Sequence, residues 1–168
     1  MKQEYFLTII CIIGLVLFNF WMIFTGARPW IISSLNILFH EAGHWIFFVF
    51  GEFMYVLGGT LGEILVPSTI IIHFCWRQHI LGQVFGWWWL STALYSISIY
   101  VSDARAQVLP LIGGPGGHDW LYILGRLRLL DSDIFIGRIF VFLSVVATFF
   151  IIWLGHRYLE HERGKIIS

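Results

Sequence analysis

Long apolar runs alternate with short polar breaks along this chain of 168 residues. Five of these runs are each about 20 residues long, which is enough for a helix to cross a hydrocarbon core of roughly 30 Å. The pattern predicts an all-α, polytopic membrane protein with about five transmembrane helices, at residues 5–24, 30–50, 53–74, 81–101 and 134–155.

Glycine, proline and capping residues mark the ends and contacts of these helices. Pro29 fits the first turn of the second helix, and residues 131–133 are good capping residues for the last one. In the third helix, the small residues at 58–62 allow two backbones to approach closely in lipid, so this helix should pack tightly against the second. Pro67 should kink the third helix. The polar tail at 156–168 is expected to fray.

The connection before the last helix is long and runs from residue 102 to residue 133. It contains a glycine-rich run at 113–117 and an amphipathic stretch at 120–130. A connection of this length in a compact protein is usually functional or disordered, and its apolar content argues against disorder. Because no room remains for a separate soluble domain, we expect residues 1–168 to form a single transmembrane domain.

The composition agrees with a membrane protein. The chain is 58% hydrophobic and 12% charged, about half the charge of a soluble domain, and its mean hydropathy is +0.82. Its net charge is zero and it has no basic cluster, which argues against nucleic acid as a partner. The first apolar run is too long for a signal peptide and lacks a small-x-small cleavage site, so we expect it to be retained as a helix.

The second apolar run carries an H-E-x-x-H motif, His40-Glu41-Ala42-Gly43-His44. On a helix, His40 and His44 lie one turn apart on the same face, so both imidazoles can reach one metal ion. Glu41 lies beside them, where it can take a proton from a metal-bound water. Ionisable groups are costly to bury in a membrane and mark functional sites there. A metal site is therefore favoured over the alternative, in which the two histidines only hydrogen-bond neighbouring helices.

A catalytic zinc ion normally takes three protein ligands and leaves one position for water. Zinc is thus the expected cofactor, and the third ligand must come from outside the motif. The second helix ends on the same face of the membrane as the connection 102–133, which can fold back over the site. His118 and Asp119 are the main candidates, and the sequence does not decide between them. Asp119 is also well placed to cap the helix expected at 120–130.

Asp103 and Glu63 are candidates for indirect roles. Asp103 ends the fourth helix and lies two residues from Arg105, so an ion pair or a contact with a ligand residue is favoured over direct metal binding. Glu63 lies about three turns into the third helix, where it can hold a histidine N–H or a substrate backbone group. The alternative for Glu63 is a protonated glutamate buried in the helix bundle.

An H-E-x-x-H motif in a transmembrane helix, followed by a later acidic residue near another helix, resembles the site-2 protease family of intramembrane zinc metalloproteases. The resemblance implies that His40 and His44 bind zinc and that Glu41 is the general base. Residues 109–119 are similar to a loosened form of the family's second motif, with Asp119 in the place of its aspartate. Asp119 is followed by Trp120 where the family has glycine, so the chain resembles a divergent, minimal member.

The resemblance and the motif together predict a membrane-embedded zinc metallopeptidase, placed in the inner membrane of a prokaryotic cell. Its partners would be membrane lipid and a transmembrane or membrane-adjacent peptide substrate. One alternative is a non-catalytic membrane protein, either a degenerate protease or a module that binds metal or partner helices. A diiron lipid oxidase is less favoured, because such sites need about eight clustered histidines, whereas the seven histidines here include one such pair and are otherwise scattered.

Overall fold

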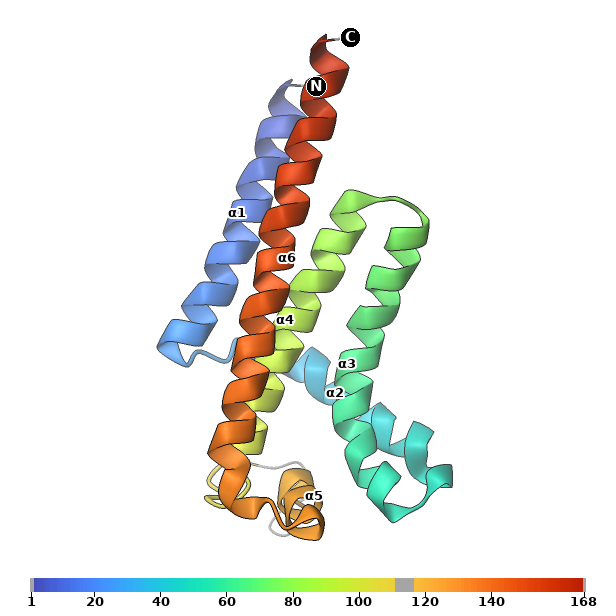
Figure 1. The fold of residues 1–168 in the computed structure, drawn as a ribbon, viewed down its shortest axis with the longest axis vertical. Helices are drawn as coiled ribbons and strands as arrows, with labels where there is room; N and C mark the ends of the chain where they lie inside the picture. The colour runs from blue at the N-terminus through green and yellow to red at the C-terminus, as the bar shows by residue number, and fades with distance from the viewer. Residues whose placement is uncertain (1, 111–116, 168) are drawn as a thin grey trace.

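The computed structural model describes residues 2–110 and 117–167, and these residues form helices and short connections without a strand (Figure 1). Six α-helices follow one another, and a 3-10 turn extends α2 and another precedes α6. In chain order they are α1 (Lys2–Thr25), α2 (Trp30–Phe47), η1 (Phe48–Phe50), α3 (Glu52–Trp76), α4 (Ile80–Ser102), α5 (Asp119–Leu127), η2 (Leu130–Ser132) and α6 (Asp133–Ile167).

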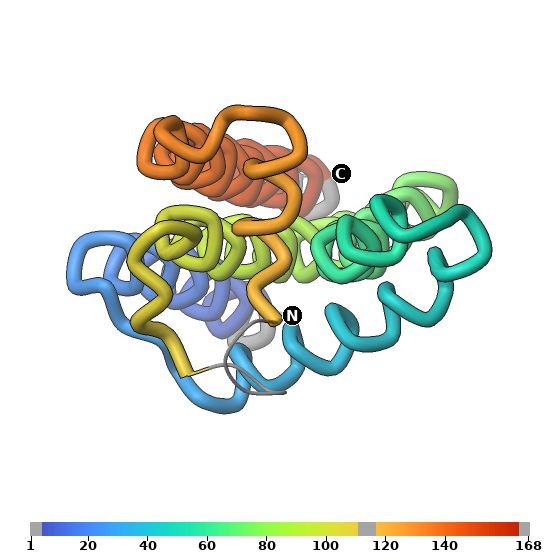
Figure 2. Tube along the Cα trace, turned by 90° about the horizontal axis from the view of Figure 1, so that it is seen from below, coloured from blue at the N-terminus to red at the C-terminus, as the bar shows by residue number. Residues whose placement is uncertain are grey.

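The long helices α1, α3, α4 and α6 run along the long axis of the molecule, whereas α2 lies obliquely to them (Figure 1). Seen from below, α5 starts close to α2 and leads back toward α6 (Figure 2). Helix α4 is central, because it packs along α6 on one side and along α3 on the other, and α2 packs on α3. This arrangement brings α2, α3 and α5 together at one end of the bundle.

Close backbone contact fixes the position of α2 on α3. A Cβ atom on Gly43 of α2 would collide with the carbonyl oxygen of Gly58, and one on Gly62 would collide with the carbonyl oxygen of Phe39. Only glycine permits this approach, because any side chain would push the helices apart. The prediction that the third helix packs tightly against the second through its small residues is confirmed.

Buried hydroxyl and amide groups join α1, α4 and α6. The Asn19 side chain donates a hydrogen bond to Thr148 Oγ1 at 3.1 Å, and Ser91 Oγ lies 2.9 Å from the same oxygen. Ser144 Oγ donates to the Ser91 carbonyl at 2.8 Å. All four side chains are buried. In a hydrocarbon environment such bonds hold helices together, since burial of apolar surface adds little there.

Three helical segments are long and apolar enough to cross a membrane, namely Tyr5–Thr25, Glu52–Trp76 and Leu130–Gly164. They indicate a membrane protein and confirm the all-helical class. The prediction of five crossings is not confirmed. Neither α2 nor α4 is among these segments, and both chain termini lie at the same end of the bundle (Figure 1), whereas five crossings would separate them.

Several helix ends differ from their predicted positions. Helix α6 continues to Ile167, so the tail expected to fray is helical instead. Helix α5 ends at Leu127, short of the expected residue 130, and is capped by His118 rather than by Asp119. Most of the predicted glycine-rich run 113–117 lies outside the described residues. Pro67 lies inside α3, and the kink expected there stays a prediction.

Candidate metal centre

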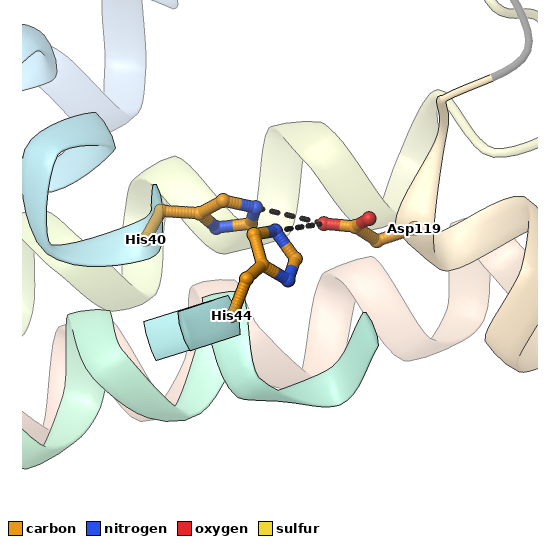
Figure 3. Close-up of side chains that lie close together, drawn as sticks. All are labelled: His40, His44 and Asp119. Atoms are coloured by element: carbon orange, nitrogen blue, oxygen red, sulfur yellow. Dashed lines mark hydrogen bonds and ion pairs between the residues drawn. The ribbon is translucent and has the colours of Figure 1, made fainter. Parts of the chain in front are cut away.

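Two histidines of α2 and an aspartate of α5 meet at one end of the bundle (Figure 3). His40 Nε2 lies 2.7 Å from Asp119 Oδ2, and His44 Nε2 lies 3.3 Å from the same oxygen. One ligand atom from each of the three side chains lies within 4.8 Å of the others. The side chains are only 11%, 9% and 13% exposed. The fold therefore joins the H-E-x-x-H helix to a carboxylate 79 residues further along the chain.

In both histidine rings, the Nδ1 atom, which is the nitrogen remote from Asp119, lies against a hydrogen-bond acceptor. His44 Nδ1 lies 2.7 Å from the carbonyl oxygen of Tyr55, and His40 Nδ1 lies 2.8 Å from Glu63 Oε1. A carbonyl oxygen can only accept, so His44 Nδ1 carries the hydrogen and donates it. His40 Nδ1 faces the Glu63 side chain in the same way. Both Nε2 atoms lie against the Asp119 carboxylate, which can only accept. A metal ion bound among the three side chains would take the place of the ring hydrogens that point to this oxygen.

The donor set fits zinc. Two imidazole nitrogens and one carboxylate oxygen are ligands that zinc takes in hydrolytic sites, where a fourth position stays open for water. Acceptors on the remote ring nitrogens are the usual partners of metal-binding histidines. His40, His44 and Asp119 would hold the ion.

Glycine in α3 makes room for the His40 ring. Gly59 and Glu63 lie one turn apart on the face of α3 that packs on α2. A Cβ atom on Gly59 would lie 2.5 Å from His40 Nε2, far inside van der Waals contact. Glu63 meets the same ring through its Nδ1 atom. One face of α3 thus sets both the space and the orientation of the ring.

Glu41 lies on the wall of a cavity of about 430 Å³ that opens beside the cluster. Glu41 is exposed, whereas the two histidines that flank it in the motif are buried. The cavity wall combines polar residues with apolar ones from α2, α3, α4 and the connection after α4, among them Ile37, Val56, Ile99, Leu109 and Pro110. A group that exchanges protons with a bound molecule needs this access.

Asp119 is held as a carboxylate. Its burial acts to raise its pKa, but hydrogen bonds with His40 and His44 outweigh the burial and hold the pKa below its ordinary value. A carboxylate that stays ionised is ready to bind a cation.

His118 is separate from the cluster, although the sequence made it an equal candidate for the third ligand. Its Nδ1 atom accepts a hydrogen bond from the backbone N–H of Leu121 at 3.3 Å and so caps α5. Its Nε2 atom lies 3.5 Å from Asp103 Oδ2. Burial lowers the pKa of His118, although the charges of Asp103 and Asp119 oppose the shift. The structure therefore favours Asp119 over His118.

Asp103 has a different partner from the one expected. Its neighbour Arg105 pairs with Asp133, with Nη2 2.7 Å from Oδ1 and Nε 2.9 Å from Oδ2. Asp103 instead accepts hydrogen bonds from the backbone N–H groups of Val108 and Leu109 at 3.0 and 3.1 Å. The predicted ion pair between Asp103 and Arg105 is absent among the described residues, and Asp103 lies instead beside His118, the residue before Asp119.

Two groups at the site were not identified from the sequence. The backbone carbonyl of Tyr55 holds His44, and a backbone acceptor leaves no signal in residue types. Tyr100 accepts a hydrogen bond on its hydroxyl oxygen from the backbone N–H of Asp119 at 3.0 Å. A signal for Tyr100 does exist, since it lies three residues before Asp103 and therefore on the same face of α4.

No known protein family, no curated protein and no solved structure matches this chain. The similarity to site-2 proteases rests on the motif residues alone, and part of the second motif, residues 111–116, lies outside the described residues.

Proposed function

We propose that the protein is a membrane-embedded zinc-dependent hydrolase that cuts a membrane-spanning or membrane-adjacent peptide. One observation carries the proposal. The Nε2 atoms of His40 and His44 and one oxygen of Asp119 converge within 4.8 Å, and Glu41 lies on the wall of the adjoining cavity. An accessible carboxylate next to the three ligand residues is what a general base requires, so Glu41 favours a catalytic site over a purely structural metal site.

Each residue has a defined task in this mechanism. His40, His44 and Asp119 would hold a zinc ion, which would act as a Lewis acid on a water ligand and on the substrate carbonyl group. Glu41 takes the proton of the attacking water and passes it to the departing amine. Glu63 and the Tyr55 carbonyl keep the two histidine rings in place.

The cavity supports a peptide as the substrate. Its volume of about 430 Å³ lies in the range of ordinary ligand sites. Apolar side chains from three helices line it beside the charged cluster, so it can receive an apolar side chain next to the bond to be cut. The three segments that are long and apolar enough to cross a membrane agree with a substrate that lies in or beside one.

A diiron oxidase is less well supported. Among the described residues, His40, His44 and Asp119 form the single group of three ligand residues close enough to hold a metal. A second iron would need further histidines beside them, and His118 already caps α5.

The test combines metal analysis with proteolysis. Detergent-purified protein should contain about one zinc per chain, and Glu41→Gln should keep this zinc while losing cleavage of a mixed peptide library read by mass spectrometry. Asp119→Ala should bind zinc far more weakly than wild type, whereas His118→Ala, which removes no ligand, should still contain zinc. Glu160→Gln, a change in the exposed end of α6, is the matched control. Wild-type protein that takes up no zinc, or a Glu41→Gln variant that still cleaves, would contradict the proposal.

A further inference from the structure

We propose that Tyr100 and Asp103, at the end of α4, are positioning residues that hold Asp119 in place as the third metal ligand. The inference rests on the proposed zinc site and adds two residues that never touch the ion. They act on the chain just before and at the start of α5, which carries the ligand.

Tyr100 contacts both helices that supply ligands. Its hydroxyl oxygen accepts the backbone N–H of Asp119 at 3.0 Å. Its ring stacks on the His118 ring with centroids 4.4 Å apart and lies against the edge of the His40 ring at 5.7 Å. The phenol therefore fixes the first residue of α5 relative to the H-E-x-x-H helix.

Asp103 binds the chain on both sides of the undescribed residues 111–116. Its two oxygens accept the N–H groups of Val108 and Leu109, and Oδ2 also lies 3.5 Å from His118 Nε2. Because His118 Nδ1 accepts from Leu121, that nitrogen bears no hydrogen. The ring proton is then on Nε2, a buried atom that lies near the Asp103 carboxylate without forming a hydrogen bond. The side chain of Asp103 is 6% exposed, so this charge acts in a buried setting.

Helix α5 needs such support, because its nine residues are too few for a stable isolated helix. Its apolar side packs on the end of α4, where Trp120, Ile123 and Leu124 join Ile97 and Val101 in one buried cluster. That packing holds the helix but does not direct its first carboxylate. The polar contacts of Tyr100 and Asp103 act at the end of α5 where Asp119 lies.

The test measures metal binding directly and needs no substrate. Zinc affinity of the full-length protein in detergent is measured by competition with a chromophoric chelator, and the visible spectrum of the Co²⁺-loaded protein reports the ligand set. Tyr100→Phe and Asp103→Asn should each weaken zinc binding by about 10-fold or more, the size seen when partners of metal ligands are lost. Their Co²⁺ spectra should shift toward that of Asp119→Ala. Tyr95→Phe, a buried tyrosine of the same helix that does not line the cavity, should resemble wild type.

A double variant separates positioning from general stability. If Tyr100 acts through Asp119, Tyr100→Phe should have no further effect on zinc affinity in the Asp119→Ala background. Additive losses, or wild-type affinity and spectrum in both Tyr100→Phe and Asp103→Asn, would overturn the inference. Wild-type protein that binds neither Zn²⁺ nor Co²⁺ would instead overturn the proposed function, so the two failures are distinct.

Discussion

Glu63 Oε1 lies 2.8 Å from His40 Nδ1, and this is the one hydrogen bond of the Glu63 carboxylate among the described residues. The second oxygen, Oε2, is buried and has no partner there. The burial of this side chain is costly, and its contact with His40 is the compensation that the described residues provide. Helix α3 thus carries a side chain that makes the His40 ring a better ligand for a metal cation.

Replacing Glu63 should therefore weaken metal binding without removing a ligand. Glu63→Gln keeps the shape and an acceptor oxygen but loses the charge, so zinc affinity should fall by about 10-fold. Glu63→Leu, which also leaves the ring N–H without an acceptor, should reduce it further, toward about 100-fold. Equilibrium competition with a chelator measures both. Glu160→Gln serves as the control, and equal affinities in Glu63→Leu and wild type would show that the contact is dispensable.

Gly59→Ala should disturb the site through steric crowding alone. The added methyl group would lie 2.5 Å from His40 Nε2, and the neighbouring backbone of α2 and α3 is already in contact. The His40 ring must shift from its place, so we expect at least a 10-fold loss of zinc affinity with the helix content kept. Gly14→Ala adds the same methyl where no atom lies within 4 Å. If the two variants bound zinc equally, the close approach of α3 to His40 would not matter.

The sequence predicted the core of the site because its geometry is local. His40 and His44 are four residues apart on a helix, and this spacing alone brings both rings to one side. Glycines at 58–62 also indicated which helices meet. Glu63 was placed in the third helix, but its pairing with His40 depends on how α2 is positioned along α3. The close backbone contact between Gly43 and Gly58 determines that position.

The choice between His118 and Asp119 could not be made from the sequence. Adjacent residues at a helix start point in different directions, and which one faces the cluster depends on which one caps the helix. His118 takes the cap with its Nδ1 atom, which leaves Asp119 in the first turn facing α2. Preferences for capping residues had favoured Asp119 as the cap. The contacts of Tyr100 and Asp103, which are tertiary, decide otherwise.

The buried polar cluster between α1, α4 and α6 should contribute measurably to stability. Thr148→Val keeps the shape but leaves the Asn19 amide, which donates to Thr148 at 3.1 Å, with no partner in a buried place. We expect the free energy of unfolding to fall by about 1 kcal/mol, the size of an interhelical hydrogen bond in a membrane protein. Reversible unfolding in mixed micelles measures it. Thr69→Val is the control, since Thr69 is exposed and bonds only within its own helix to Leu65.

Arg105 has two acidic neighbours in very different surroundings, and their removal should have unequal effects. The Asp133 side chain is 2% exposed and accepts two charge-assisted bonds from Arg105, whereas Asp131 is fully exposed and lies 3.6 Å away. Asp133→Asn should lower the Tm of the metal-free protein by roughly 4 °C, because the charge-assisted bonds between the buried Asp133 carboxylate and the exposed Arg105 guanidinium are weakened at the start of α6. Asp131→Asn should leave the Tm unchanged, since exposed ion pairs contribute little. Thermal unfolding followed by circular dichroism compares the two, and equal shifts would contradict the assignment of Asp133 as the main partner of Arg105.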